Sequence, residues 1–165
     1  CNEVWNMDML TAIEQWVDKV NHKYKYKRVC CTQFTAQFAG FYPTEFLENA
    51  FYLVIDEIPK PDFAALRAMG LGDFIDMKVS GITYKNTYYL LPTSVDNLRV
   101  HFHELVHVLQ WQNLGALAFI ERYMNEIKHF GYHNAPLEIM AYSLDTHFIN
   151  SGEEINLPEY VLDAL

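Results

Sequence analysis

The chain has 165 residues, of which 51% are hydrophobic and 15% aromatic, so it can bury a core and is not a disordered protein. Its formal charge of −9 argues against a nucleic-acid-binding protein. No run of about 18 apolar residues occurs, so no membrane-spanning segment is predicted. We expect a single domain over residues 1–165.

The three cysteines cannot form a disulfide framework, because two of them, Cys30 and Cys31, are adjacent in the chain. The compartment is left open by this count. A cytoplasmic location is favoured, and a lipid-modified N-terminal Cys1 is the alternative.

The N-terminal part predicts one long helix and then irregular structure. Residues 8–20 place apolar side chains on one face at helical spacing. The basic stretch 22–28, HKYKYKR, predicts a solvated helix end or edge strand, and a small anion-binding patch is the alternative. Short helical pieces are expected over 30–49, broken around Gly40 and Pro43.

The middle of the chain predicts β-structure. Residues 50–58 are rich in strand-forming side chains and are closed by prolines. A short helix is expected over 62–69, ending at Gly70. Residues 79–91 predict a second strand, or a tight hairpin that bends near Lys85-Asn86.

After Pro92 the pattern becomes helical. One helix is expected from a cap at Ser94 or Asp96 to Gly115, and a second over about 116–129. A third opens at Asn134 and Pro136. The predicted fold class is therefore α+β, with a short sheet packed on the first of these helices and two helices following it.

The first of these helices carries the sequence His103-Glu104-Leu105-Val106-His107, an HExxH motif. Residues four apart share a helical face, so both imidazoles can reach one Zn²⁺ ion. Glu104 is rotated by about 100° from His103 around the axis. It can therefore act as the general base that takes a proton from a zinc-bound water.

A catalytic zinc requires a third protein ligand. The HxxGxxH continuation of metzincins is absent, because Gln110 and Asn113 occupy its glycine and histidine positions. Glu138 is the preferred third ligand, since it is a carboxylate in the first turn of a largely apolar helix. His133, which would make a three-histidine site, is the runner-up. The other candidates considered are Glu121, Glu126, His129, Asp145 and His147.

The segments HFHELVHVLQ and PLEIMAY resemble the small bacterial zincin-like domains with an HELxHVxQ sequence and, more loosely, the minimal gluzincins. The resemblance covers about residues 79–148. It implies a zincin-like fold with His103, His107 and Glu138 as zinc ligands and Glu104 as the general base. Larger gluzincins have an aspartate four residues after the ligand glutamate, where this chain has Tyr142. We therefore expect Asp145 to be the carboxylate that orients a ligand histidine.

The predicted function is zinc-dependent hydrolysis of a peptide or protein substrate. The alternative is a non-catalytic zinc-binding domain that serves structure or protein recognition. The oligomeric state is left open. Oxyanion stabilisation requires a donor opposite the metal, and the candidates are Tyr132, Tyr142, His133 and His147. His101 should point away from the metal and lie at the surface or behind the ligands.

Overall fold

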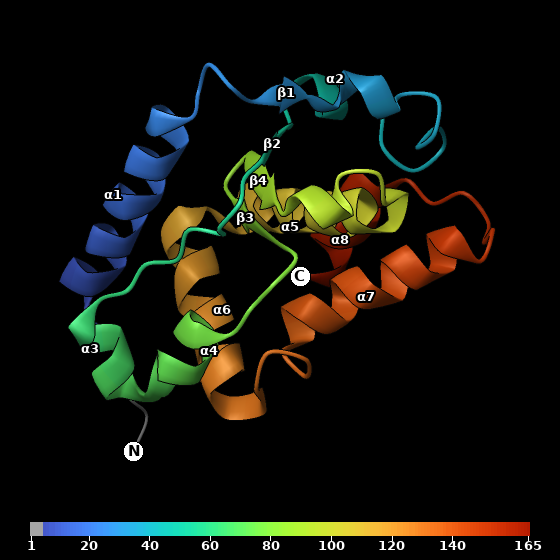
Figure 1. The fold of residues 1–165 in the computed structure, drawn as a ribbon. Coiled ribbons are helices and arrows are strands. Elements are labelled where there is room, and N and C mark those ends of the chain that lie inside the picture. Colours follow the sequence, from blue (N-terminus) through green and yellow to red (C-terminus); the bar gives the residue numbers. More distant parts are fainter. Residues whose placement is uncertain (1–4) are drawn as a thin grey trace.

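The computed structural model describes residues 5–165, and the expectation about Cys1 lies outside them. It shows an α+β fold in which helices surround a four-stranded sheet (Figure 1). The helices are α1 (Met7–Lys23), α2 (Thr44–Glu48), α3 (Ala64–Leu66), α4 (Gly72–Asp76), α5 (Leu98–Leu114), α6 (Ala116–Phe130), α7 (Pro136–Ile149) and α8 (Leu157–Ala164). The strands are β1 (Val29–Cys30), β2 (Phe51–Val54), β3 (Gly81–Tyr84) and β4 (Thr87–Leu90).

The sheet has the order β1-β2-β4-β3, so β3 is an edge strand. β2 and β4 are parallel, and the other two pairs are antiparallel. Residues 79–91 form the predicted hairpin, with Lys85 at φ 59° in its two-residue turn. Thr83 lies opposite Tyr88, and Gly81 lies opposite Leu90, so the side chains of Thr83, Tyr88 and Leu90 share the face of the sheet on which Gly81 leaves space.

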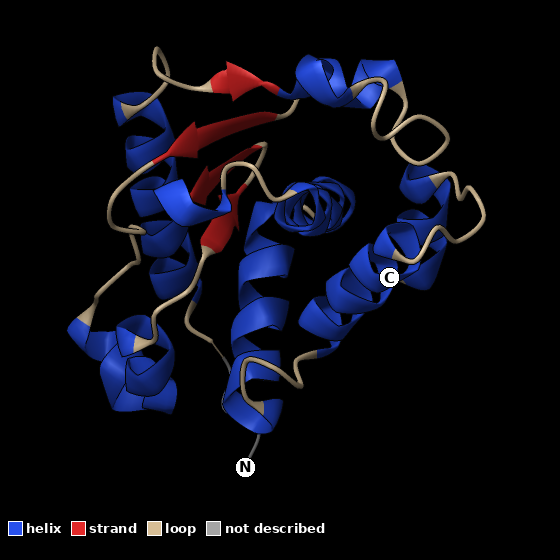
Figure 2. Cartoon of the chain, turned by 45° about the vertical axis from the view of Figure 1, so that its right-hand side comes forward, coloured by secondary structure: helices blue, strands red, loops and turns tan. Residues whose placement is uncertain are grey.

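Helix α5 lies at the centre of the fold, in contact with β3, β4, α6, α7 and α8. Figure 2 shows it nearly end-on between the strands and the C-terminal helices. Its residues 101–111 are all buried, although the stretch contains three histidines, a glutamate and a glutamine. Polar groups at this depth require partners, and those partners define the site described below.

The other face of the sheet packs on α1. The ring of Trp16 meets that of Tyr84 edge-on, at 5.3 Å between centroids. The Asn21 amide group donates to the Tyr84 carbonyl oxygen and accepts from the Tyr89 hydroxyl group. The residues of α1 therefore belong to the same core as β3 and α6.

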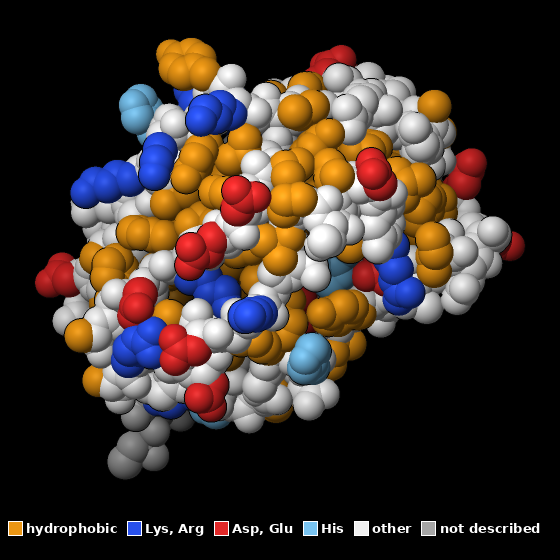
Figure 3. All heavy atoms as spheres, in the orientation of Figure 1, with side chains coloured by type: hydrophobic (Ala, Val, Ile, Leu, Met, Phe, Trp, Pro, Cys, Tyr) orange, Lys and Arg blue, Asp and Glu red, His pale blue; other side chains and the backbone are white. Residues whose placement is uncertain are grey.

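The basic stretch 22–28 ends α1 and forms the turn that follows it. Its lysine and arginine side chains gather at one corner of the face drawn in Figure 3. Tyr26 is 93% exposed, and the Arg28 guanidinium group lies over the Phe51 ring at 3.7 Å. This placement agrees with the solvated helix end that the sequence predicts.

Several predicted boundaries are wrong for local reasons. The strand predicted over 50–58 ends at Val54. Gly70 does not end the helix predicted over 62–69: with φ 95° it forms a kink, and the chain continues into α4. The cap of α5 is Asn97, whose side chain accepts from the Arg99 amide, rather than Ser94 or Asp96. Helix α8 follows α7, and the sequence patterns do not predict it.

Within residues 5–165, no helix combines the length and the hydropathy that crossing a membrane requires.

Candidate metal centre

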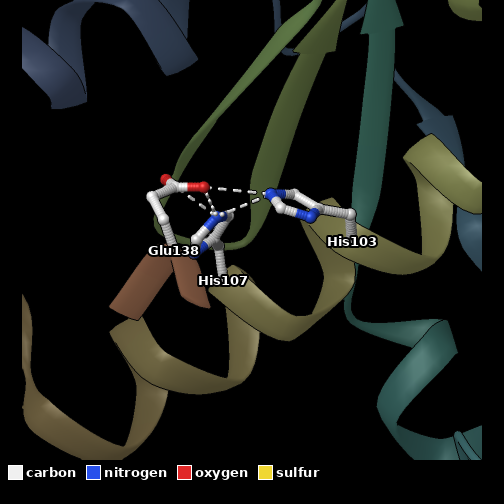
Figure 4. Close-up of side chains that lie close together, drawn as sticks. All are labelled: His103, His107 and Glu138. Atoms are coloured by element: carbon white, nitrogen blue, oxygen red, sulfur yellow. Dashed lines mark hydrogen bonds and ion pairs between the residues drawn. The ribbon is translucent and has the colours of Figure 1, made fainter. Parts of the chain in front are cut away.

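Three side chains converge at one buried point between α5 and α7: His103, His107 and Glu138 (Figure 4). The Nε2 atoms of the two histidines are 3.2 Å apart, and each lies 3.1 Å from Oε1 of Glu138. All three residues are at most 6% exposed. The i, i+4 spacing on α5 supplies two members, and the first turn of α7 supplies the third.

These separations fit a tetrahedral metal ion. Bonds of about 2.0–2.1 Å at tetrahedral angles place neighbouring ligand atoms roughly 3.3 Å apart. The three measured separations are within a few tenths of an ångström of that value. Two imidazole nitrogens and one carboxylate oxygen are also a donor set that zinc accepts.

The second nitrogen of each histidine ring has its own acceptor. Nδ1 of His103 lies 2.9 Å from Oδ2 of Asp145, and Nδ1 of His107 lies 2.7 Å from Oε1 of Gln110. The Gln110 amide group donates to the Leu137 carbonyl oxygen, which fixes its orientation. Both Nδ1 atoms therefore carry the proton, and the Nε2 lone pairs point at the convergence point.

Two lone pairs at 3.2 Å repel unless a cation lies between them, and in the metal-free protein that cation is a proton. Burial lowers the pKa of His103, but hydrogen bonds to Asp145 and Glu138 outweigh burial and raise it to about 10. The pKa of His107 is also raised, because the charge of Glu138 outweighs burial. Burial raises the pKa of Glu138, but the two histidines lower it more, so its carboxylate stays ionised. The cluster thus attracts positive charge.

Glu104 lies beside the cluster. Its Oε2 accepts from the Thr83 hydroxyl group at 2.7 Å, and it is 5% exposed. Burial raises the pKa of Glu104, while the neighbouring histidines and the Thr83 hydrogen bond lower it. Gly81 leaves room for this carboxylate, since a Cβ atom there would lie 3.1 Å from Oε1 of Glu104.

Tyr123, Gln110 and Thr83 hold the cluster in place, and none of them was predicted as a site residue. The Tyr123 hydroxyl group donates to Oε2 of Glu138 at 2.7 Å. For Tyr123 and Gln110 the sequence contains a signal, because each is a hydrogen-bonding residue on the otherwise apolar face of its own helix and therefore needs a partner. For Thr83 there was none, because its partner lies 21 residues further along the chain.

Asp145, the carboxylate expected to orient a ligand histidine, lies in α7 and faces His103. Its Oδ1 accepts from Nε of Arg99 at 2.8 Å while its Oδ2 faces His103. Tyr142 is 36% exposed, with its ring centroid 4.5 Å from that of His103. Tyr132 lines the same groove as Tyr142.

The remaining histidines are not brought to the cluster. His133 is exposed on the wall of the groove outside it. His147 bonds to the Glu153 carbonyl oxygen. The expectation that His101 lies at the surface or behind the ligands is wrong. It is 1% exposed and bridges the Tyr88 hydroxyl group and the Val95 carbonyl oxygen.

Glu126, another candidate ligand, positions the third member of the cluster. Its Oε1 accepts from the Leu137 backbone amide at 2.7 Å. The N-cap residue of α7 is Ala135, whose side chain makes no capping hydrogen bond, so the prediction of Asn134 as the cap is wrong. Glu126 on α6 instead accepts from one of the free backbone amides at the start of α7. The start of α7, and with it Glu138, is thereby fixed relative to α6.

Two hollows meet at Glu104. One is an open groove with polar and charged walls, which include Arg99, His103 and Asp145. The other is an apolar pocket whose lining includes His107, Tyr123 and Glu138. Glu104 therefore lines both hollows.

Comparison with known proteins gives no relative from which a role could be transferred: no family model matches the chain, and neither a curated protein nor a solved structure matches it.

Proposed function

We propose that this protein is a zinc-dependent peptidase with a zincin-like active site. The observation that carries the proposal is the convergence of His103, His107 and Glu138 within 4.8 Å of one another, with the buried carboxylate of Glu104 beside them. A buried group of three metal-ligand side chains is costly unless a cation compensates it. A general base adjacent to such a group is the arrangement that metal-assisted hydrolysis requires.

A zinc ion held by the two Nε2 atoms and the Glu138 carboxylate would polarise a carbonyl group and lower the pKa of water. The chain's own residues would supply the proton transfers. Glu104 would take the proton of the attacking water and deliver it to the leaving amine. Burial raises the pKa of Glu104 above that of an exposed glutamate, which makes its carboxylate a stronger base. Tyr142, whose ring packs against that of His103, and Tyr132, which lines the groove beside it, are the candidate hydroxyl donors for the oxyanion.

The alternative function is a zinc site that serves structure or protein recognition. A closed structural site has four protein ligands. Among residues 5–165, the cluster that could hold a metal comprises three residues, which leaves a coordination position for water. A structural site also has no use for a buried carboxylate such as Glu104. Both observations favour the catalytic proposal.

The test is cleavage of a mixed peptide library by zinc-loaded protein, comparing wild type with Glu104→Gln. We expect cleavage by wild type and a loss of roughly 100-fold or more in the variant, because the general base is removed. Glu45→Gln, the same change at an exposed position, should leave cleavage unchanged. No cleavage by zinc-loaded wild type, or full activity in Glu104→Gln, would refute the proposal.

A further inference from the structure

The positive charge of this protein is concentrated in one short stretch of the chain. Five of its twelve lysine and arginine residues lie within residues 19–28, which contain no acidic residue and which we call the basic segment. They are Lys19, Lys23, Lys25, Lys27 and Arg28. The four lysines are exposed and Arg28 is half-buried. A strongly positive local surface therefore exists at the end of α1 and in the turn after it, although the formal charge is −9.

The fold does not neutralise these charges. In the part of the chain that the structure describes, none of the five side chains forms an ion pair with a carboxylate. Most of the other basic side chains are bonded to carboxylate or carbonyl oxygens: Lys60, Arg67, Lys85, Arg99 and Arg122. The charge of the basic segment thus remains available to an anion outside the chain.

An aromatic ring projects from the same segment. Tyr26 lies in the turn with a lysine on each side and is 93% exposed. The turn is ordered, because backbone hydrogen bonds close it within residues 22–27. Tyr24 anchors its base, with its ring edge-on to that of Tyr89 at 5.9 Å between centroids. Val29, which follows the turn, is 41% exposed. The fold therefore presents an apolar ring outward in the middle of a positive surface.

We propose that the basic segment docks this protein on an anionic membrane surface, with its cations at the lipid phosphates and Tyr26 at headgroup depth. Tyrosine favours that depth because its ring is apolar while its hydroxyl group stays hydrated. An acidic peptide fits this surface less well, since an outward-pointing ring offers no groove to receive one. The inference is independent of the metal centre.

The acidic remainder of the chain does not oppose this docking. At physiological ionic strength charges are screened over about 8 Å, so an anionic surface responds to the residues that touch it. Residues 101–165 contain nine acidic and two basic residues, and α7 and α8 lie on the side of the molecule away from α1 (Figure 1). Repulsion of that side would orient the bound molecule with the basic segment towards the membrane.

The test is sedimentation with vesicles of phosphatidylcholine and phosphatidylserine in equal parts, compared with vesicles of phosphatidylcholine alone. We expect wild type to bind the mixed vesicles, not to bind the neutral ones, and to dissociate as salt is added. Each lysine or arginine at such a surface strengthens binding by about fivefold. The triple variant Lys23→Gln, Lys25→Gln, Lys27→Gln should therefore bind about 100-fold more weakly.

A matched pair of single variants controls for the general loss of a lysine. Lys25→Gln should weaken binding to the mixed vesicles by about fivefold, whereas Lys78→Gln, at an exposed position outside the basic segment, should leave it unchanged. No binding of wild type to the mixed vesicles, or equal binding of wild type and the triple variant, would overturn the proposal. Binding of wild type to a polyglutamate peptide but not to the mixed vesicles would also overturn it, in favour of an acidic protein partner.

The ring is tested separately from the charges. Tyr26→Ser should weaken binding to the mixed vesicles at unchanged charge, and Tyr26→Trp should retain it, because tryptophan favours the same depth. Tyr160→Ser is the control, since Tyr160 is 46% exposed on α8 and lies outside the basic segment. Equal binding of Tyr26→Ser and Tyr160→Ser would overturn the placement of Tyr26 among the headgroups.

Discussion

The Thr83 hydroxyl group donates a hydrogen bond of 2.7 Å to Oε2 of Glu104, and so joins the edge strand β3 to the central helix α5. The same hydroxyl group lies 3.2 Å from the backbone carbonyl oxygen of Glu104. Because both residues are buried, this contact fixes the direction of the carboxylate. The strand thus positions the proposed general base, in addition to lining the apolar pocket beside it.

Thr83→Val should shift the pH dependence of hydrolysis. The Thr83 hydrogen bond lowers the pKa of Glu104 against the larger, opposing effect of burial. Its loss raises that pKa, so more of the carboxylate is protonated at a given pH and the acidic limb of the rate profile moves to higher pH. A profile of kcat/KM against pH measures the shift. Thr87→Val on β4 is the control, and an unmoved limb in Thr83→Val would count against the role assigned to Thr83.

Gly81→Ala should disturb the same region sterically. A Cβ atom there would lie 2.7 Å from Cδ2 of Leu90 and 3.1 Å from the Tyr89 carbonyl oxygen. Overpacking of this kind costs about 1–3 kcal/mol. We expect a lower free energy of unfolding. Activity should fall by more than this destabilisation alone explains, because Oε1 of Glu104 is also displaced.

The matched control for Gly81→Ala is Gly72→Ala in α4. The nearest atom there is 3.8 Å away, and the backbone is already helical. Alanine at such a position should be neutral or stabilise by up to about 1 kcal/mol. Equal unfolding midpoints for the two variants in a denaturant titration would show that position 81 tolerates a side chain.

The sequence predicted the local features of this protein better than its long-range contacts. The spacing of His103 and His107, the hairpin turn at Lys85 and the glycines that end α5 and α6 are local signals, and each appears in the structure. The pairing of Asp145 with Arg99 depends on how α7 packs on α5, which periodicity does not specify. The α+β fold class also follows from local patterns along the chain. The parallel pairing of β2 with β4 does not.

The site shows the same division. The HExxH spacing alone predicted three site residues. The contacts of Tyr123 and Gln110 and the apolar pocket arise from tertiary packing, which in the pocket joins segments up to about three quarters of the chain apart. The cap supplied by Glu126 likewise comes from the preceding helix α6 rather than from α7 itself. Propensity and pattern do not encode such contacts directly.

Asp145→Asn should weaken zinc binding without abolishing it. The neutral amide retains the volume but not the charge that holds the Nδ1 proton of His103. Loss of such a supporting partner typically costs about 10–100-fold in metal affinity. Competition with a chelator measures the change. Asp163→Asn, at an exposed position of α8, should bind zinc as tightly as wild type, and equal affinity in both variants would contradict the role of Asp145.

The stability of the metal-free protein should fall as the pH rises. The pKa of His103 is about 10 in the folded state, above its ordinary value of 6.5. Its protonation therefore contributes stability fully below about pH 6.5, and that contribution is lost as the pH rises towards 10. Thermal melts in chelator across this range measure the decline.

Zinc should reverse this trend, because it binds the neutral imidazoles in competition with the proton. The gap between the melting temperatures of zinc-loaded and metal-free protein should widen between pH 6.5 and 10. A gap that narrows over this interval would show that zinc is not bound by these histidines.

The most direct test of the account is the zinc content of protein purified without added metal, compared at one chelator concentration for wild type, Glu138→Ala and His133→Ala. Elemental analysis should find about one zinc ion per chain in wild type and in His133→Ala, because His133 is exposed outside the cluster. Glu138→Ala should lose most of its zinc, since it lacks one of three ligands. A wild-type protein without zinc, or an empty His133→Ala beside a fully loaded Glu138→Ala, would contradict the proposed metal centre.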